Sequence, residues 1–297
     1  MNAYVNCLFK RYLHDILKSS HVAIPDDPEE MNWRVFFAHS QDMQGFRADI
    51  FTGGPNEGDC KRFTGLRERW HGDSRSLISD LGSLWDDQHI RCELIRISYP
   101  FRPKEERAKG IQPALELLRN RGVHGAQVFA DALDEFTGYR IARKTNGMIR
   151  AYIQNSHLLK QHNSSYRSYI QSIVAGESFP PNNILQAENP WVESIERDFY
   201  NVGPALASYM ICDWLLWLWL KEKIDWFESY KADEVHIKAL KTALKDGRLP
   251  EAASDFVSYC KTIRIPDGYG VISGKPCPPR VLNECIWLAN NRSSVHS

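Results

Sequence analysis

Residues 196–220 read ERDFYNVGPALASYMICDWLLWLWL, and this stretch decides the fold class. From Ala205 to Leu220 it is a 16-residue apolar run that carries one carboxylate, Asp213. Gly203 suits the turn before a helix, and Pro204 suits the first helical turn. The run is shorter than the roughly 20 apolar residues that span a bilayer. The stretch therefore predicts a buried helix that begins near Pro204, and no membrane span.

Helical periodicity also dominates the rest of the chain. Apolar residues near the N-terminus recur at steps of three and four, which is typical of one face of an amphipathic helix; they are Val5, Leu8, Phe9, Tyr12, Leu13, Ile16 and Leu17. Similar patterns predict helices over residues 77–99, 113–122, 148–162, 164–176, 191–200, 233–247, 249–263 and 280–291. Strand signals are few. We therefore expect a mostly α protein with at most a few short strands.

Two stretches interrupt the helical pattern. Residues 45–72 are rich in glycine and charge without a sustained period, and residues 179–190 contain Pro180-Pro181 and several asparagines. Such composition is typical of loops and boundaries. We expect an N-terminal helical lobe over residues 1–178 with a Gly-rich insert, and a hairpin-containing helical lobe over residues 191–290. The two lobes are expected to form one integrated domain.

The composition limits the classes of partner and compartment. The 37 Lys and Arg balance the 37 Asp and Glu, so any contact with a polyanion must come from a local patch. The N-terminus has no apolar signal-peptide core, which favours a cytoplasmic protein, in the host cytoplasm if a phage encodes it. Seven cysteines without a CxxC pair are expected to be free thiols. The gaps between Cys260, Cys277 and Cys285 match no common zinc or iron–sulfur spacing, so no metal site is predicted.

Three stretches occur in an order that resembles the helix-hairpin-helix DNA glycosylase superfamily: ERDFYNVGPALASYMICDWL at 196–215, FESYKADEVHIKAL at 227–240 and RVLNECIWLA at 280–289. In that superfamily, a glycine-containing turn leads into a helix whose first amides bind a DNA phosphate. The resemblance implies a glycosylase-like helical fold with a DNA phosphate bound at Val202, Gly203 and Ala205. Free N–H groups and the positive end of the helix dipole supply the attraction. An ordinary turn before a helix is the alternative interpretation.

The superfamily carries its catalytic acid in a following x-D-x-H stretch. Asp233-Glu234-Val235-His236 is similar to it, and aligning Val-His implies that Glu234 is the acid, with His236 beside it. One inserted residue would instead make Asp233 the acid. Alternatively, both carboxylates are ordinary residues of a helix start, where the dipole favours them. The lysine of bifunctional glycosylases would fall near Ala205, which cannot form a Schiff base, so lyase chemistry is not expected.

Upstream, residues 134–159 read DEFTGYRIARKTNGMIRAYIQNSHLL. This stretch resembles the α-glutamyl/putrescinyl-thymine pyrophosphorylases, which are the amino acid:DNA transferases of phage thymine hypermodification. The similarity extends over residues 136–287, about half of the chain. A turn at Thr145-Asn146-Gly147 would direct several cations toward a polyphosphate, although a solvated helix surface is the alternative. The candidate substrate-binding residues are Tyr139, Arg140, Arg143, Lys144 and Arg150.

The two resemblances together imply a transferase that acts on DNA. It would replace the pyrophosphate of 5-(pyrophosphoryloxymethyl)uracil in DNA with an amino acid or polyamine. This chemistry needs cations for the leaving group and a base for the incoming amine. No cofactor is assigned, although a divalent cation such as Mg²⁺ would suit the pyrophosphate. The alternatives are a monofunctional DNA glycosylase and a non-catalytic DNA-binding module, and a free nucleotide is an alternative substrate.

Overall fold

The computed structural model describes residues 1–18, 32, 69–99, 110–137, 146–174, 189–228, 230 and 234–293. Most of these residues are helical, which confirms the mostly α fold class. The described residues contain no strand, and one isolated β-bridge joins Arg264 to Pro276. No helix in this part of the chain is long and apolar enough to cross a membrane.

The chain divides into two compact units. The first comprises residues 1–25, 176–194 and 203–297, and the second comprises residues 26–175 and 195–202, as far as these are described. The N-terminal helices therefore belong with the C-terminal ones, and not with the lobe that the sequence predicted over residues 1–178. The reason is that the apolar face of the first helix packs against α17 (Pro279–Ser293).

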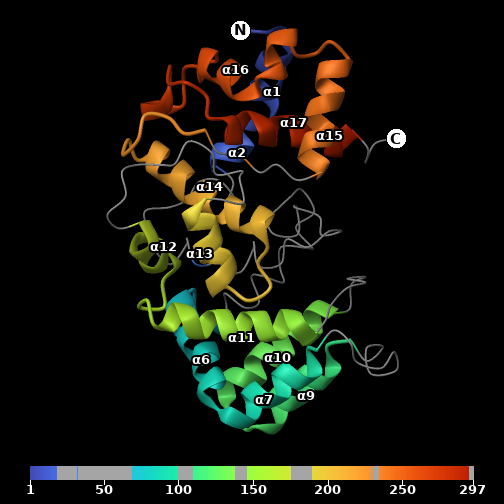
Figure 1. The fold of residues 1–297 in the computed structure, drawn as a ribbon, viewed down its shortest axis with the longest axis vertical. Coiled ribbons are helices and arrows are strands. Elements are labelled where there is room, and N and C mark those ends of the chain that lie inside the picture. Colours follow the sequence, from blue (N-terminus) through green and yellow to red (C-terminus); the bar gives the residue numbers. More distant parts are fainter. Residues whose placement is uncertain are drawn as a thin grey trace. The chain divides into compact units, whose positions relative to one another are not determined.

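The first unit is built from helices at both ends of the chain. Figure 1 shows α1, in blue, near the C-terminal helix α17, in red, against which it packs. Its elements, besides α17, are α1 (Ala3–Leu8), η1 (Phe9–Leu13), α2 (His14–Lys18), α14 (Pro204–Leu220), α15 (Glu234–Lys245), η4 (Glu251–Ser254), α16 (Phe256–Thr262) and η5 (Gly270–Ile272). α13 (Pro190–Asp198) spans the boundary between the two units.

The first helix contains a π-helical segment, η1, between α1 and α2. Its apolar stripe repeats every four residues, as in Val5, Phe9, Leu13 and Leu17. An α-helix turns every 3.6 residues, so such a stripe would drift around it. The wider π turn absorbs the drift, and these four side chains are all buried. The amphipathic helix is confirmed, and its period of four explains the π segment.

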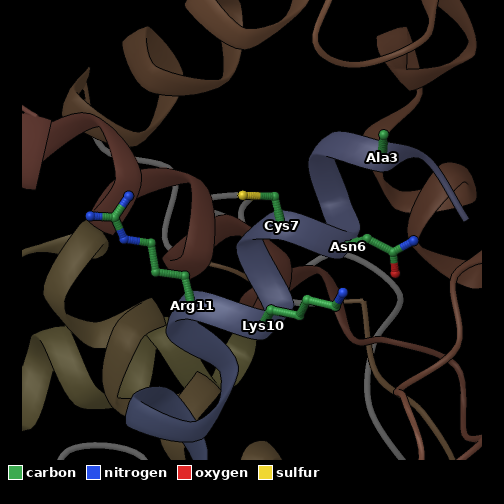
Figure 2. A pocket seen from close by; sticks show the side chains of 5 residues that line it. All are labelled: Ala3, Asn6, Cys7, Lys10 and Arg11. Carbon is green, nitrogen blue, oxygen red and sulfur yellow. The ribbon is translucent and has the colours of Figure 1, made fainter.

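The opposite side of the same helix is polar and open. An open hollow of about 620 Å³ is lined by Ala3, Asn6, Cys7, Lys10 and Arg11 (Figure 2). These residues also recur at steps of three and four, so the π turn keeps them aligned as it does the buried stripe.

The long apolar helix begins where the sequence predicted. Gly203 is the N-cap residue of α14, and Pro204 is its first residue. The helix is apolar on all sides, and Asp213 lies buried in its middle. Trp214 and Trp217 stack with ring centroids 5.0 Å apart. α14 therefore places a carboxylate in the interior of the first unit.

The second unit is a set of helices that includes α11 (Asn146–Lys160), which packs most extensively against α6 (Ser74–Asp86; Figure 1). The others are α7 (Gln88–Ile97), α9 (Gln112–Asn120), α10 (His124–Thr137) and α12 (Tyr166–Val174). α9 has Pro113 in its first turn, and Gly122 follows its end with φ +67°, as the sequence predicted. α6 and α11 pack closely because Gly82 has no side chain: an added Cβ would lie 2.8 Å from the carbonyl oxygen of Ser156.

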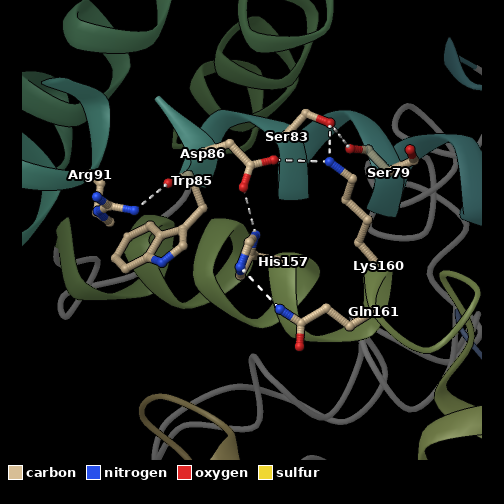
Figure 3. A network of polar contacts seen from close by, with 8 residues as sticks. All are labelled: Ser79, Ser83, Trp85, Asp86, Arg91, His157, Lys160 and Gln161. Atoms are coloured by element: carbon tan, nitrogen blue, oxygen red, sulfur yellow. Dashed lines mark hydrogen bonds and ion pairs between the residues drawn. The ribbon is translucent and has the colours of Figure 1, made fainter. Parts of the chain in front are cut away.

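A polar cluster closes one edge of the α6–α11 pair (Figure 3). Asp86 on α6 accepts from Lys160 Nζ at 2.9 Å, and its other oxygen lies 3.3 Å from Nδ1 of His157. Lys160 also donates to Ser83 at 3.0 Å, and the side chain of Gln161 lies 3.3 Å from Nε2 of His157. The cluster is largely exposed, so it ties two helix surfaces together rather than forming a site.

Candidate active site

The most unusual feature of the first unit is a buried guanidinium between α14 and α17. Arg280 on α17 is 1% exposed and Asp213 on α14 is 0% exposed. Nη2 of Arg280 lies 3.4 Å from Oδ1 of Asp213, and Nη1 donates to Oε1 of Glu284, one turn further along α17. Buried charges are tolerated when they are paired and hydrogen-bonded, as here. The guanidinium therefore bridges two carboxylates.

An aromatic ring also contacts the guanidinium of Arg280. Tyr209 lies one turn before Asp213 on α14, and the centroid of its ring is 4.0 Å from Cζ of Arg280. Burial lowers the pKa of the guanidinium, but Glu284, Tyr209 and Asp213 raise it by more, so its pKa lies well above the ordinary value. Arg280 is therefore a fixed positive charge at any working pH.

His236 on α15 joins this network through Glu284. Its Nε2 lies 3.4 Å from Oε1 of Glu284, the same oxygen that accepts from Arg280. The His236 ring stacks on Trp287 of α17, with centroids 5.7 Å apart and an interplanar angle of 13°. The imidazole is 4% exposed. A carboxylate and an indole thus fix the orientation of an imidazole, which is the arrangement in which a histidine serves as an acid or base.

The four buried thiols of the first unit, Cys212, Cys260, Cys277 and Cys285, are unsuited to nucleophilic chemistry. Burial raises the pKa of Cys212, next to Asp213, to about 12. Burial also raises the pKa values of Cys260, Cys277 and Cys285, and Cys277 adds to the shift of the other two. A thiol with a raised pKa stays protonated and is a poor nucleophile. Among the described residues, no group of three or more His, Cys, Asp and Glu side chains is arranged to hold a metal ion.

Of the two predicted carboxylates, only Glu234 lies in the described part of the chain, and it is not beside His236. Glu234 is the first residue of α15 and is exposed, whereas His236, two residues later, faces the interior. Residues two apart lie on different sides of a helix, so the observed carboxylate partner of His236 is Glu284. Asp233 lies outside the described residues. Glu284 was missed by the sequence reasoning, although its position four residues after Arg280 in an apolar helix was a signal for a buried pair.

The predicted phosphate-binding turn is present as a helix start. Gly203 is exposed, and its φ of −95° and ψ of 176° are extended angles that any residue adopts. An added Cβ would meet no atom within 4 Å, so the fold itself does not require glycine there. Val202 is buried. The first N–H groups of α14, including that of Ala205, have no intrahelical acceptor by helix geometry, and Gly203 provides no side-chain cap.

The predicted cation cluster is described only at Arg150. Tyr139, Arg140, Arg143 and Lys144 lie outside the described residues. Arg150, on α11 of the second unit, holds its guanidinium carbon 3.9 Å from the centroid of the Tyr200 ring. It also donates to Gln154 at 3.0 Å and to Ser98 at 3.3 Å. Arg150 is thus engaged in packing within its own unit, and its role toward a substrate stays a prediction.

Comparison of the chain with models of known protein families, with curated proteins and with solved structures gave no match.

Proposed function

We propose that the chain is a DNA base-hypermodifying transferase with a glycosylase-like helical fold. It would replace the pyrophosphate of 5-(pyrophosphoryloxymethyl)uracil in DNA with an amino acid or polyamine. One observation carries the proposal. The three sequence stretches that resemble the helix-hairpin-helix superfamily, far apart in the chain, supply the members of one buried network: Asp213, His236, and Arg280 with Glu284.

In the proposed reaction, the amine nitrogen attacks the methylene carbon on C5 of the base. The carbon–oxygen bond breaks, and pyrophosphate leaves with its electron pair. The new ammonium group must then lose a proton. His236 is the proposed acceptor, because Glu284 orients its ring and stabilises the imidazolium that forms. Arg280 and Asp213 hold Glu284 in place.

The start of α14 is the proposed DNA contact. Helix geometry directs its first N–H groups outward, and Gly203 leaves open space around them. A backbone phosphate fits such a position because it accepts from N–H groups and is attracted by the helix dipole. Replacing Gly203 with valine would obstruct the approach, and because the contact is to phosphate, affinity would fall to a similar extent for all DNA sequences.

The direct test is incubation of the protein with DNA that carries the pyrophosphorylated base and with a panel of amino acids and polyamines. Nucleoside mass spectrometry then reports the product. Transfer of an amine with release of pyrophosphate and an intact sugar–base bond is expected. Release of a free base would identify a glycosylase instead, and DNA binding without either product would identify a non-catalytic module.

Three variants test whether Glu284 or Glu234 is the carboxylate that amine transfer requires. Glu284→Gln keeps the size of the side chain and should slow transfer by about 10²-fold or more, the usual cost of losing acid–base catalysis. Glu234→Gln should be nearly silent, and Glu251→Gln, an exposed glutamate of the same unit, is the matched control. If Glu234→Gln has the large effect and Glu284→Gln has none, the acid implied by the sequence resemblance is correct. Circular dichroism of each variant separates lost chemistry from lost folding.

A further inference from the structure

We propose that the exposed face of α1 and η1 binds the sugar–phosphate backbone of a nucleic-acid strand. The inference rests on the proposed function only in taking DNA as that strand. The site is the open hollow of about 620 Å³ in the first unit. It is separate from the start of α14 and from the network around Arg280.

The chemistry of the hollow selects an anion. Its lining contains an ammonium group at Lys10, a guanidinium group at Arg11 and an amide at Asn6, and none of the described residues that line it is acidic. These are the donor types that contact phosphate oxygens in protein–DNA complexes. In a chain with no net charge, such a local patch is how a polyanion is attracted.

The arrangement of the cations selects an extended anion over a compact one. The side chains form two rows along the helix, Asn6 with Lys10 and Cys7 with Arg11, four residues apart in each row. In Figure 2, Lys10 and Arg11 point to opposite sides of the helix. Divergent cations do not converge on one phosphate group, but a strand that crosses the helix presents successive phosphates to both. The backbone of a nucleic acid therefore fits better than inorganic pyrophosphate.

The π turn gives the face its geometry. The π turn keeps residues that are four apart aligned through η1. Each row of side chains therefore runs straight along the exposed side of the helix, and the apolar stripe on the other side stays buried. π-helical segments are rare and are frequent at functional sites. The cations at positions 10 and 11 both lie within this segment.

Cys7 provides a reporter inside the hollow. Cys7 and Cys92 are exposed thiols, and Cys92 lies in the other unit. The full-length protein is treated with iodoacetamide, an uncharged reagent, with and without a short unmodified DNA duplex, and the alkylation of each cysteine is followed by peptide mass spectrometry. In the presence of duplex, alkylation of Cys7 should slow in proportion to the fraction of protein bound, whereas Cys92 serves as the internal reference.

The charge variant is Lys10→Gln with Arg11→Gln, and its control is Lys241→Gln with Lys245→Gln, two exposed lysines of α15 in the same unit. Both pairs remove two positive charges. The first pair should abolish protection of Cys7 and lower the steepness of the plot of log affinity against log salt by about 2, since each phosphate contact contributes roughly 0.9. The control pair should leave protection intact.

Several results would overturn the inference: an unprotected Cys7 while duplex is bound, equal losses in the two charge variants, equal protection by inorganic pyrophosphate, or no duplex binding at low salt. The proposed function is judged separately by amine transfer. Protection of Cys7 without any transfer would remove the proposed reaction and leave this surface standing. Amine transfer without protection of Cys7 would support the proposed reaction and remove this surface as a DNA contact.

Discussion

In the first unit, α14 and α17 meet across a buried guanidinium between two carboxylates, whereas in the second unit α6 and α11 meet at Gly82, with one helix backbone against the other. Both contacts hold two helices together, but only the contact between α14 and α17 carries the desolvation cost of buried charge. Apolar residues of similar volume are often as stable as a buried ion pair, or more so. The charges of the first unit are therefore poorly explained by stability alone, and this favours placing the active site there.

The largest expected effect comes from removing the buried cation. Arg280→Met leaves Asp213 and Glu284 inside the first unit without their shared partner, and this should cost about 3–5 kcal/mol of unfolding free energy. Urea denaturation followed by circular dichroism measures the loss. Hydrogen exchange should show that amides of α14 and α17 lose protection while those of α6 and α11 keep it.

The control for this prediction is Arg121→Met. Arg121 pairs with Asp87 at the surface of the second unit, and surface pairs contribute at most about 1 kcal/mol. If both arginine variants cost the same, the contrast between a charged interior and an exposed pair does not hold.

The second prediction breaks the close packing of the second unit. In Gly82→Ala, the new methyl group meets the backbone of Ser156, which cannot rotate away, so α6 and α11 must separate. We expect a loss of about 1–3 kcal/mol, typical of overpacking. In Gly125→Ala, the nearest atoms belong to the Asp80 side chain, 3.3 Å away, and the helix propensity of alanine offsets the contact. Equal thermal shifts in the two variants would show that Gly82 is not the point of closest approach.

Much of this fold was readable from local sequence, whereas the site was not. Pro204 and Gly122 marked helix ends because proline and glycine act on the backbone of their own turn. The partnership of His236 with Glu284 joins residues 48 positions apart, and that of Asp213 with Arg280 joins residues 67 apart. Local patterns in a single sequence do not predict contacts between residues so far apart in the chain. The sequence motif predicted a carboxylate beside His236 and pointed to Glu234, two residues away. The carboxylate that packing brings to His236 is that of Glu284.

The third prediction concerns a half-buried cation of the second unit, Arg150, whose described contacts are aromatic rings and neutral acceptors. Its guanidinium lies over Tyr200, and such pairs contribute about 0.5–2 kcal/mol. A double-mutant cycle of Arg150→Met and Tyr200→Leu should return a coupling energy in this range. A coupling of zero would show that the two side chains are only adjacent. A far larger coupling would make Arg150 resemble Arg280 and would weaken the contrast between the units.

The smallest effect is expected at the exposed edge of the second unit, where Asp86 meets Lys160 and His157 (Figure 3). The hydrogen bond from Lys160 lowers the pKa of Asp86, with smaller contributions from the charges of Lys160 and His157. A carboxylate whose pKa is lowered by folding stabilises the protein above its unfolded pKa of about 3.9, and that contribution is lost as the pH falls through the lowered value. Lys160→Met should therefore cost less than about 1 kcal/mol at neutral pH, because the pair is half exposed and screened by solvent. The difference between wild type and variant should shrink as the pH falls through the lowered pKa of Asp86, and it should vanish once the carboxyl is protonated in both the folded and the unfolded states. A difference that persists unchanged at low pH would mean that Lys160 acts through the packing of its methylene chain on α6, and the second unit would then be stabilised by apolar contact even at its charged edge.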